Sequence, residues 1–247
     1  EAICEAVTRP TMRFVPVKSA ERQGVLVLHR TRDLLMRQRT MLLNAVRGHL
    51  AEFGIIAPQG PSKALELIAQ LREGAHEDLP DVARTVLLGI GVQLDALGTQ
   101  IHDLERQLLA WHRQDEVSRR LETIPGVGIL TATALAASVP DTSVFRSGRQ
   151  FAAFLGLTPR QNSLGGKDKL GRISKMGDGY LRRLLVIGAT SVIRRAYTNP
   201  SATGAWVRSL LTHKSKRLTT VAMANKTARI AWAVMARGET YRAPVMA

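Results

Sequence analysis

The hydrophobic positions along residues 87–111 repeat with the clearest period in the chain. Apolar side chains follow one another at alternating spacings of three and four residues, which makes an a/d heptad seam on one face of a long α-helix. This pattern predicts a helix that packs back on its own chain as an antiparallel hairpin, or one that self-associates as a coiled coil. The seam consists of Leu87, Ile90, Leu94, Leu97, Ile101, Leu104, Leu108 and Trp111.

Helical spacing of apolar residues continues on both sides of that seam. An extended segment is expected over residues 13–18, because Pro16 disfavours the α conformation at Val15, and a turn-rich break is expected over residues 54–61. This order of elements predicts an all-α architecture, with a helical-hairpin or coiled-coil arm followed by a helical domain. The other helices are expected over residues 19–53, 62–73, 121–139, 148–155, 178–197, 204–211 and 219–237.

The composition agrees with a helical protein in a reducing compartment. Hydrophobic residues make up 45% of the chain and aromatic residues only 4%, whereas strands are enriched in aromatic and β-branched residues. A single cysteine, Cys4, leaves no disulfide within the chain. No apolar run reaches the roughly 20 residues that cross a bilayer, and no signal peptide is recognisable. We therefore expect a cytoplasmic protein that does not enter a membrane.

The positive charge of the chain is concentrated in its second half. The formal net charge is +15. Residues 1–118 hold 14 Lys and Arg against 15 Asp and Glu, while residues 119–247 hold 21 against 5. A step of this kind indicates two functional regions, of which the second binds a polyanion, normally nucleic acid.

Residues 121–134 have the form of a helix-hairpin-helix. Leu121 and Ile124 end one helix, a Pro-Gly-Val-Gly turn follows, and a helix of small residues comes next. Gly126 and Gly128 would let the backbone approach a phosphate and direct the free amides of a helix N-terminus toward it. The alternative is an ordinary turn between two helices. Contacts of the first kind position nucleic acid and do not read its bases.

A polar, glycine-punctuated loop over residues 156–178 is the second candidate site. Between residues 160 and 195 there are nine Lys and Arg against two Asp, a charge suited to a phosphodiester backbone. Ser163 lies at the centre of the loop, but a serine hydroxyl is a poor nucleophile unless a neighbour removes its proton. No His or carboxylate of the loop obviously does so. On the residues alone, a turn serine in a solvated basic loop is the favoured interpretation.

Five motifs follow one another in order through the basic half: Ile124-Pro-Gly-Val-Gly128, Phe151-Ala-Ala-Phe-Leu-Gly-Leu-Thr-Pro-Arg160, Ser163 with Gly165-Gly166-Lys167, Gly171-Arg-Ile-Ser-Lys175 and Leu181-Arg-Arg-Leu-Leu185. Together they resemble the C-terminal domain of the DEDD-type insertion-sequence transposases of the one-ten family, eleven-eleven subgroup, which are related to the Piv pilin-gene invertase. The resemblance covers about residues 121–237. The heptad region resembles the central coiled coil of that family.

The resemblance implies a specific chemistry. In that family an RNase H-like N-terminal domain binds magnesium through four carboxylates, and a serine of the C-terminal domain attacks the scissile phosphate. Carried onto this chain, the catalytic nucleophile is Ser163, because Leu164 stands where the family often has a second Ser or Thr. The residues expected to bind nucleic acid are Gly126, Gly128, Arg160, Gly165, Gly166, Lys167, Lys169, Arg172, Lys175, Arg182 and Arg183.

The resemblance also implies a domain order and a set of partners. Residues 1–18 are expected to be a remnant of the RNase H-like domain, residues 19–118 an arm, and residues 119–247 the basic transposase domain. We expect no metal to be bound by this chain, magnesium in the full-length enzyme, and no strand cleavage by the fragment alone. The expected partners are DNA, in some members a bridge RNA, and further copies of the chain joined as a dimer or tetramer through residues 87–111. The alternative function is a non-enzymatic DNA- or RNA-binding helix-hairpin-helix module.

Overall fold

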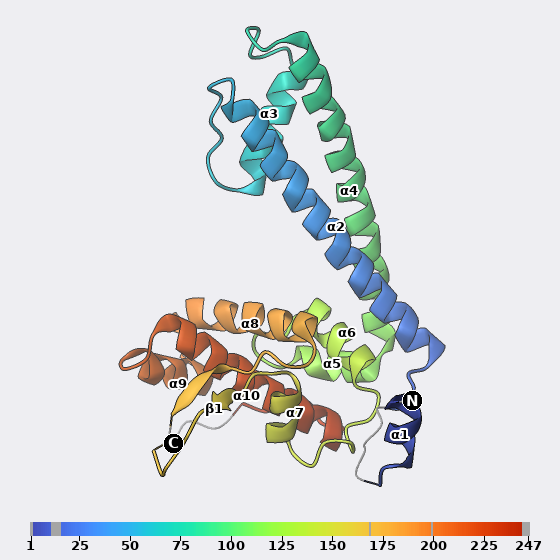
Figure 1. The fold of residues 1–247 in the computed structure, drawn as a ribbon, viewed down its shortest axis with the longest axis vertical. Coiled ribbons are helices and arrows are strands. Elements are labelled where there is room, and N and C mark those ends of the chain that lie inside the picture. The colour runs from blue at the N-terminus through green and yellow to red at the C-terminus, as the bar shows by residue number, and fades with distance from the viewer. Residues whose placement is uncertain (1, 11–15, 168, 199, 244–247) are drawn as a thin grey trace. The chain divides into compact units, whose positions relative to one another are not determined.

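The computed structural model describes residues 2–10, 16–167, 169–198 and 200–243 (Figure 1). The chain forms two compact units. The arm unit comprises Val27–Ala110, and the basic unit comprises Glu1–Leu26 together with Trp111–Ala247. Each unit has its own hydrophobic core.

The arm unit is built from three helices, of which the first and the last extend beyond its bounds. They are α2 (Ala20–Ala51), α3 (Pro61–Arg72) and α4 (Asp81–Gln114). They confirm the helices expected from the apolar spacing, and the ends of α2 and α3 differ by at most two residues from the expected ones. Pro61 occupies the first turn of α3, where its missing N–H costs no hydrogen bond. Of the residues expected to be extended before α2, those from 13 to 15 lie outside the described residues.

The heptad seam of α4 faces the core of the arm unit. Leu87 and Leu94 are buried in one cluster with residues of α2 and α3, among them Leu50 and Ile68. Gly91 lies on the same side, since a Cβ added there would stand 2.7 Å from Cγ2 of Ile68. Leu87, Ile90 and Leu94 of the seam thus pack within the arm unit, and association of α4 with another copy stays a prediction.

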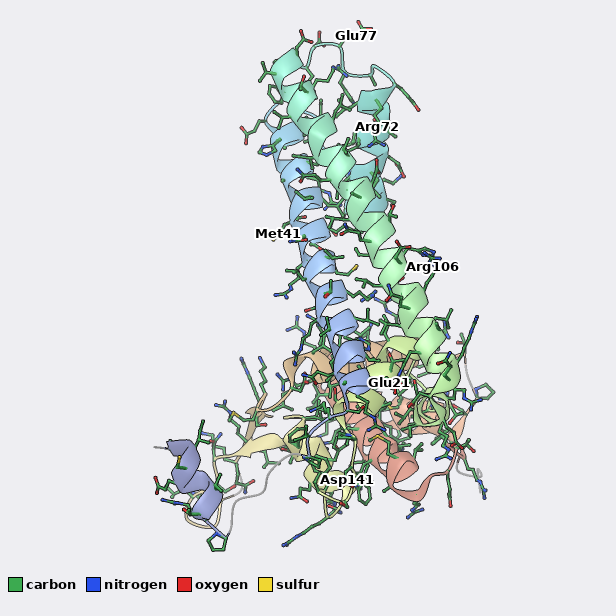
Figure 2. The ribbon with its side chains drawn as sticks, turned by 90° about the vertical axis from the view of Figure 1, so that its right-hand side faces the viewer. Glu21, Met41, Arg72, Glu77, Arg106 and Asp141 are labelled. Carbon is green, nitrogen blue, oxygen red and sulfur yellow. The ribbon has the colours of Figure 1, made fainter. Side chains whose placement is uncertain are left out.

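The exposed surface of the arm unit carries both charged and apolar side chains. Arg32 of α2 donates to Glu105 of α4 over 2.8 Å, and Met41 and Arg106 point outward from their helices (Figure 2). Among the described residues, α4 is the one helix long and apolar enough to cross a membrane by length and composition. Part of its apolar seam packs on α2 and α3, and 17% of its most apolar stretch is buried in the structure.

Among the described residues, α1 (Ala2–Thr8) and six further helices belong to the basic unit, together with a two-stranded sheet. The helix expected over residues 121–139 is in fact two helices, with the Pro-Gly-Val-Gly turn between them. Most starts are fixed by a capping side chain that accepts a backbone N–H of the first turn, as Ser147, Asp178, Ser201 and Ser215 do. The helices are α5 (Glu116–Glu122), α6 (Ile129–Ser138), α7 (Gly148–Phe154), α8 (Gly179–Arg194), α9 (Ala202–Leu211) and α10 (Lys216–Arg237).

Helix α10 forms the centre of the basic unit. It packs against α7, α8, α5 and α9, and its small side chains Ala224, Ala228 and Ala231 are buried. Small residues let the backbones of neighbouring helices come close, so that one helix can contact four others. The remaining core comes from α6, α7 and α8, including Leu135, Phe151 and Leu185.

The sheet is a departure from the all-α expectation, although the chain is mainly helical as predicted. β1 (Pro159–Gln161) and β2 (Leu170–Ile173) pair antiparallel inside the segment expected to be a loop. The strands were missed because most of their residues are exposed, so they lack the alternation of apolar and polar residues that marks a half-buried strand.

Candidate nucleic-acid interface

The connection between β1 and β2 is a tight hairpin turn. Gly165 and Gly166 have φ of 58° and 75°, and positive φ at both central residues is the requirement of a type I′ turn. The N–H of Lys167 donates to the carbonyl of Leu164 over 3.2 Å and closes the turn. The two glycines expected to approach a phosphate therefore form an open tip, with no atom within 4 Å of an added Cβ.

The base of the hairpin is fixed to the end of α7 and the start of α8. A Cβ added to Gly177 would lie 1.9 Å from the carbonyl oxygen of Phe154, so only glycine fits this crossing. Nη1 of Arg182 donates to the carbonyls of Leu155 and Met176, each over 3.0 Å. Arg182 thus positions the hairpin, and its expected contact with nucleic acid stays a prediction.

Ser163 lies just before the turn, and two donors hold its hydroxyl. Its Oγ accepts a hydrogen bond from Nε2 of Gln161 over 2.7 Å and one from the backbone N–H of Lys169 over 3.0 Å. Donors aimed at an oxygen favour its deprotonated form. The side chain is half-buried within the hairpin and is not part of the hydrophobic core.

Gln161 was not identified from the sequence. Gln161 and Ser163 stand two residues apart, and such residues share one face of an extended segment. This spacing was the available signal, but it required knowing that the segment is a strand.

The hairpin also brings together most of the cations expected to bind nucleic acid. Nη2 of Arg160 donates to the carbonyl of Ser174 over 3.2 Å, which keeps this guanidinium along the hairpin. Arg183 lies in the first turn of α8, with its guanidinium 5.2 Å from the ring centre of Tyr180. The exposed cations of the hairpin are Arg160, Lys167, Lys169, Arg172 and Lys175.

The α5–α6 turn holds the other two predicted glycines, apart from the hairpin in sequence. Gly126 has φ of 84° and lies against Gly188 of α8, where an added Cβ would stand 2.8 Å from the carbonyl oxygen. Packing therefore explains a glycine at position 126. Gly128 is exposed and precedes α6 with no side chain near it, so of the two it has the more open backbone. Binding of nucleic acid by either glycine stays a prediction.

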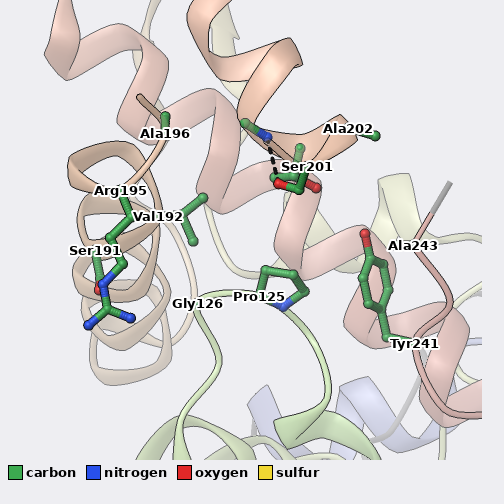
Figure 3. Close-up of a pocket in the computed structure, with 12 residues that line it drawn as sticks. Pro125, Gly126, Ser191, Val192, Arg195, Ala196, Ser201, Ala202, Tyr241 and Ala243 are labelled. Carbon is green, nitrogen blue, oxygen red and sulfur yellow. Dashed lines mark hydrogen bonds between the residues drawn. The ribbon is translucent and has the colours of Figure 1, made fainter. Parts of the chain in front are cut away.

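A cavity of about 290 Å³ lies beside this turn (Figure 3). Pro125 and Tyr241 border it, together with the end of α8 and the start of α9. The N–H of Tyr241 donates to Oγ1 of Thr123 over 2.9 Å, so the chain beyond α10 returns to the turn. Oγ of Ser201 accepts the N–H of Gly204 and so caps α9. Arg195 is the charged residue among those that line the cavity.

A serine, a histidine and a glutamate meet at the start of α5 but form no reactive site. Nδ1 of His112 lies 2.7 Å from Oγ of Ser118, and its Nε2 lies 2.9 Å from Oε2 of Glu122. These spacings resemble a hydrolase triad. Ser118, however, is 0% exposed, so no substrate reaches it. The three side chains instead join the end of α4 to α5.

The described residues do not form a metal site. Among them, no group of three or more His, Cys, Asp and Glu side chains lies close enough to hold an ion. Magnesium prefers several carboxylate and water oxygens in octahedral geometry. The donor set of the described chain therefore does not fit magnesium.

Comparison with known proteins identifies the family. The family model "Transposase IS116/IS110/IS902 family" matches residues 118–204, which run from α5 through the hairpin to the start of α9. A Sinorhizobium fredii protein named as a transposase (y4pF/y4sB) and a Pseudomonas aeruginosa protein named as a family 20 transposase are each 46% identical over 98% of this chain. The Yersinia enterocolitica transposase of insertion sequence element IS1328 is 39% identical over 98% of this chain.

The similarity extends far beyond the motifs around Ser163. The chain spans 62% of the Sinorhizobium protein, 72% of the Pseudomonas protein and 71% of the Yersinia protein. Identity of this size over nearly the whole chain includes both the arm unit and the basic unit. The chain therefore belongs to the IS116/IS110/IS902 family of transposases.

Proposed function

We propose that the basic unit holds DNA during transposition and that Ser163 is the nucleophile that cleaves and rejoins it. One observation carries the proposal. The hydroxyl of Ser163 accepts hydrogen bonds from Gln161 and Lys169 on a hairpin that carries five exposed cations against one acidic residue of its sequence, Asp168. Such a surface attracts phosphates, and a fixed hydroxyl on it is oriented for attack on one of them.

The proposed step exchanges one phosphate ester for another. Oγ of Ser163 bonds to phosphorus, the bond from phosphorus to one deoxyribose oxygen breaks, and that oxygen takes up a proton while the serine loses one. The number of phosphoester bonds is conserved, so a second attack by a deoxyribose hydroxyl can rejoin the DNA and release the serine. The hydrogen bonds from Gln161 and Lys169 would stabilise negative charge on Oγ as its proton leaves.

The magnesium expected for this reaction would come from outside these residues. The described side chains do not fit the ion, and the relatives contain stretches that this chain does not match. We propose that an acidic domain with its own carboxylates supplies the metal. When bound, magnesium would polarise the scissile phosphate.

A covalent adduct tests the nucleophile. The 247-residue chain is incubated with magnesium, the separately produced acidic domain of a relative, and DNA that carries the ends of its element. We expect a protein–DNA adduct that survives denaturant, and loss of at least about 1000-fold of it in Ser163→Ala, as for removal of other catalytic nucleophiles.

Ser174→Ala is the matched control, because Ser174 belongs to the same hairpin and is half-buried like Ser163. It is expected to retain the adduct. An adduct of undiminished yield in Ser163→Ala would exclude Ser163 as the nucleophile. DNA binding without an adduct in either protein would favour the alternative, a non-enzymatic DNA- or RNA-binding module.

We also propose that copies of the chain join through α4 as a dimer or tetramer. The seam of α4 is buried in its own unit, but Val82, Val86 and Val92 are exposed on the same helix, and such residues favour association when they meet another apolar face. Val86→Glu with Val92→Glu is expected to reduce the mass measured by light scattering to that of one chain. Gln100→Glu, an exposed polar change on the same helix, is expected to leave the mass unchanged.

Two further proposals concern the setting of the protein. A structured RNA is proposed as a second polyanionic partner, because contacts to phosphates serve RNA as well as DNA. Competition of an RNA transcribed from the element against DNA tests this proposal.

We also propose a soluble, cytoplasmic protein, since the family acts on DNA and the apolar seam of α4 packs on its own unit. Recovery of the chain in the membrane fraction of lysed cells would contradict it.

A further inference from the structure

The tip of the β1–β2 hairpin carries an apolar side chain in open solvent. Leu164 is 87% exposed, and Leu170 and Met176 are exposed by 64% and 68%. Single exposed apolar residues are common on protein surfaces. Here three of them stand on one short segment whose other exposed residues are polar or glycine. Such a surface indicates a partner that removes apolar side chains from water.

The tip presents Leu164 as a fixed projection. Leu164 is the first residue of the Gly165-Gly166 turn, and it pairs with Lys167 across it. On its other side, the N–H of Asn162 donates to the carbonyl of Lys169 over 2.9 Å. A side chain whose backbone is already ordered loses less conformational entropy when it binds.

The charges beside Leu164 indicate the partner. From Pro159 to Ile173 the sequence has one acidic residue, Asp168, against four cations, Arg160, Lys167, Lys169 and Arg172. In duplex DNA, phosphates flank the stacked bases. The cations along the strands of the hairpin can contact the phosphates, and its apolar tip can contact the bases. A two-stranded β-ribbon fits a DNA groove, and apolar wedges on DNA-binding proteins enter between base steps and kink the duplex.

We propose that Leu164 is a wedge that enters the base stack of DNA beside the phosphate attacked by Ser163. This inference rests on the proposed function, and it deepens it by assigning how the DNA is opened. Because Leu164 directly follows Ser163, an inserted leucine would unstack one step and hold the adjoining phosphate near the serine hydroxyl. Leu164 is a positioning residue, since it takes no part in bond making.

Preference for DNA that is already unstacked tests the wedge. The full 247-residue chain is titrated at fixed salt against an intact duplex and against the same duplex with a two-base mismatch, with fluorescence anisotropy as the readout. A wedge saves the energy of unstacking on the mismatched duplex, so we expect tighter binding there by about tenfold or more. Leu164→Ala is expected to bring the two affinities within about twofold of each other.

Three variants make the test specific. Leu164→Phe, which keeps a large apolar side chain, is expected to retain the preference. Met41→Ala of the arm unit, whose side chain is 69% exposed, is expected to change neither affinity. A 2-aminopurine base beside the mismatch is expected to brighten with the original chain and to stay dim with Leu164→Ala, because stacking quenches this base.

The outcomes separate the wedge from the proposed function. If the original chain binds both duplexes equally, or if Leu164→Ala keeps the preference, the wedge is overturned while DNA binding stands. The second result would be expected if Leu164 instead contacts a protein segment. If the chain binds neither duplex, the proposed function itself fails.

Discussion

At the scale of single residues, two glycines decide how the α5–α6 turn meets α8. The carbonyl oxygen of Gly126 would lie 1.8 Å from a Cβ at position 188, so the two backbones touch where any side chain would intrude. Gly188 lies inside a helix, where alanine is normally the more stable residue by about 1 kcal/mol. The close contact with Gly126 makes glycine the more stable residue at position 188.

We predict that Gly188→Ala destabilises the basic unit by about 1–3 kcal/mol, the usual range for overpacking. The unfolding midpoint in urea measures it, followed by tryptophan fluorescence, because all three tryptophans lie in the basic unit. Gly179→Ala on the same helix is the control, since its Cβ would meet Nη2 of Arg182 at an ordinary 3.5 Å. Equal midpoints for the two variants would contradict the close contact.

A buried histidine gives the arm unit a dependence on pH. His29 is 1% exposed, and its pKa is lowered to about 4, first by burial and then by the positive charge of Arg32. In the unfolded chain the pKa is about 6.5. Between these values the unfolded state binds more protons than the folded state, so stability is lost as the pH falls.

We expect acidification from pH 6.5 to 4 to lower the free energy of unfolding of the arm unit by up to about 3 kcal/mol. Hydrogen exchange of amides in α2 and α3, corrected for intrinsic rates, follows the loss. In His29→Gln, which does not titrate, the dependence over this range is expected to flatten. A slope unchanged by that substitution would assign the effect to another group.

At the scale of elements, the hairpin is the part that the proposed function depends on most. Its turn needs positive φ at two consecutive residues, and a β-branched side chain is strongly disfavoured there. Because no atom lies within 4 Å of an added Cβ at either glycine, a substitution acts through the backbone alone.

We predict that Gly165→Val lowers the yield of the serine adduct by about tenfold, which corresponds to about 1.4 kcal/mol of lost orientation, with the urea midpoint unchanged. Gly165→Asn is the matched control, because asparagine tolerates the left-handed region and favours type I′ turns. Similar adduct yields for the two variants would show that the turn does not position Ser163.

The sequence was sufficient for most helices and insufficient for this hairpin. Periodic apolar positions located α2, α3, α4 and α8 because each buries one face, and Ser19 and Asp178 cap the starts of α2 and α8. The hairpin buries almost nothing, so its signal was the Gly165-Gly166 pair alone. The partners of Ser163 were hidden for the same reason, since the bonds from Gln161 and Lys169 exist only once the strands are paired.

At the scale of the whole molecule, the net charge and the family both indicate a nucleic-acid partner. The packing adds which cations are exposed together. The net charge of +15 predicted a nucleic-acid partner, and membership of a transposase family implies DNA. Neither shows which cations face the phosphates. The structure brings five exposed cations, Arg160, Lys167, Lys169, Arg172 and Lys175, together on one hairpin, whereas Arg37 and Arg106 of the arm helices are paired with Asp33 and Asp103.

The salt dependence of DNA binding separates contact from total charge. Each phosphate neutralised by a cation contributes a slope of about −0.9 to log K against log salt. Lys167→Ala with Arg172→Ala is therefore expected to flatten the slope by about 2, as measured by anisotropy on one intact duplex. Arg37→Ala with Arg106→Ala removes the same two charges and is expected to leave the slope unchanged. If both pairs flatten it equally, binding follows the overall field of the protein and the hairpin does not contact the backbone.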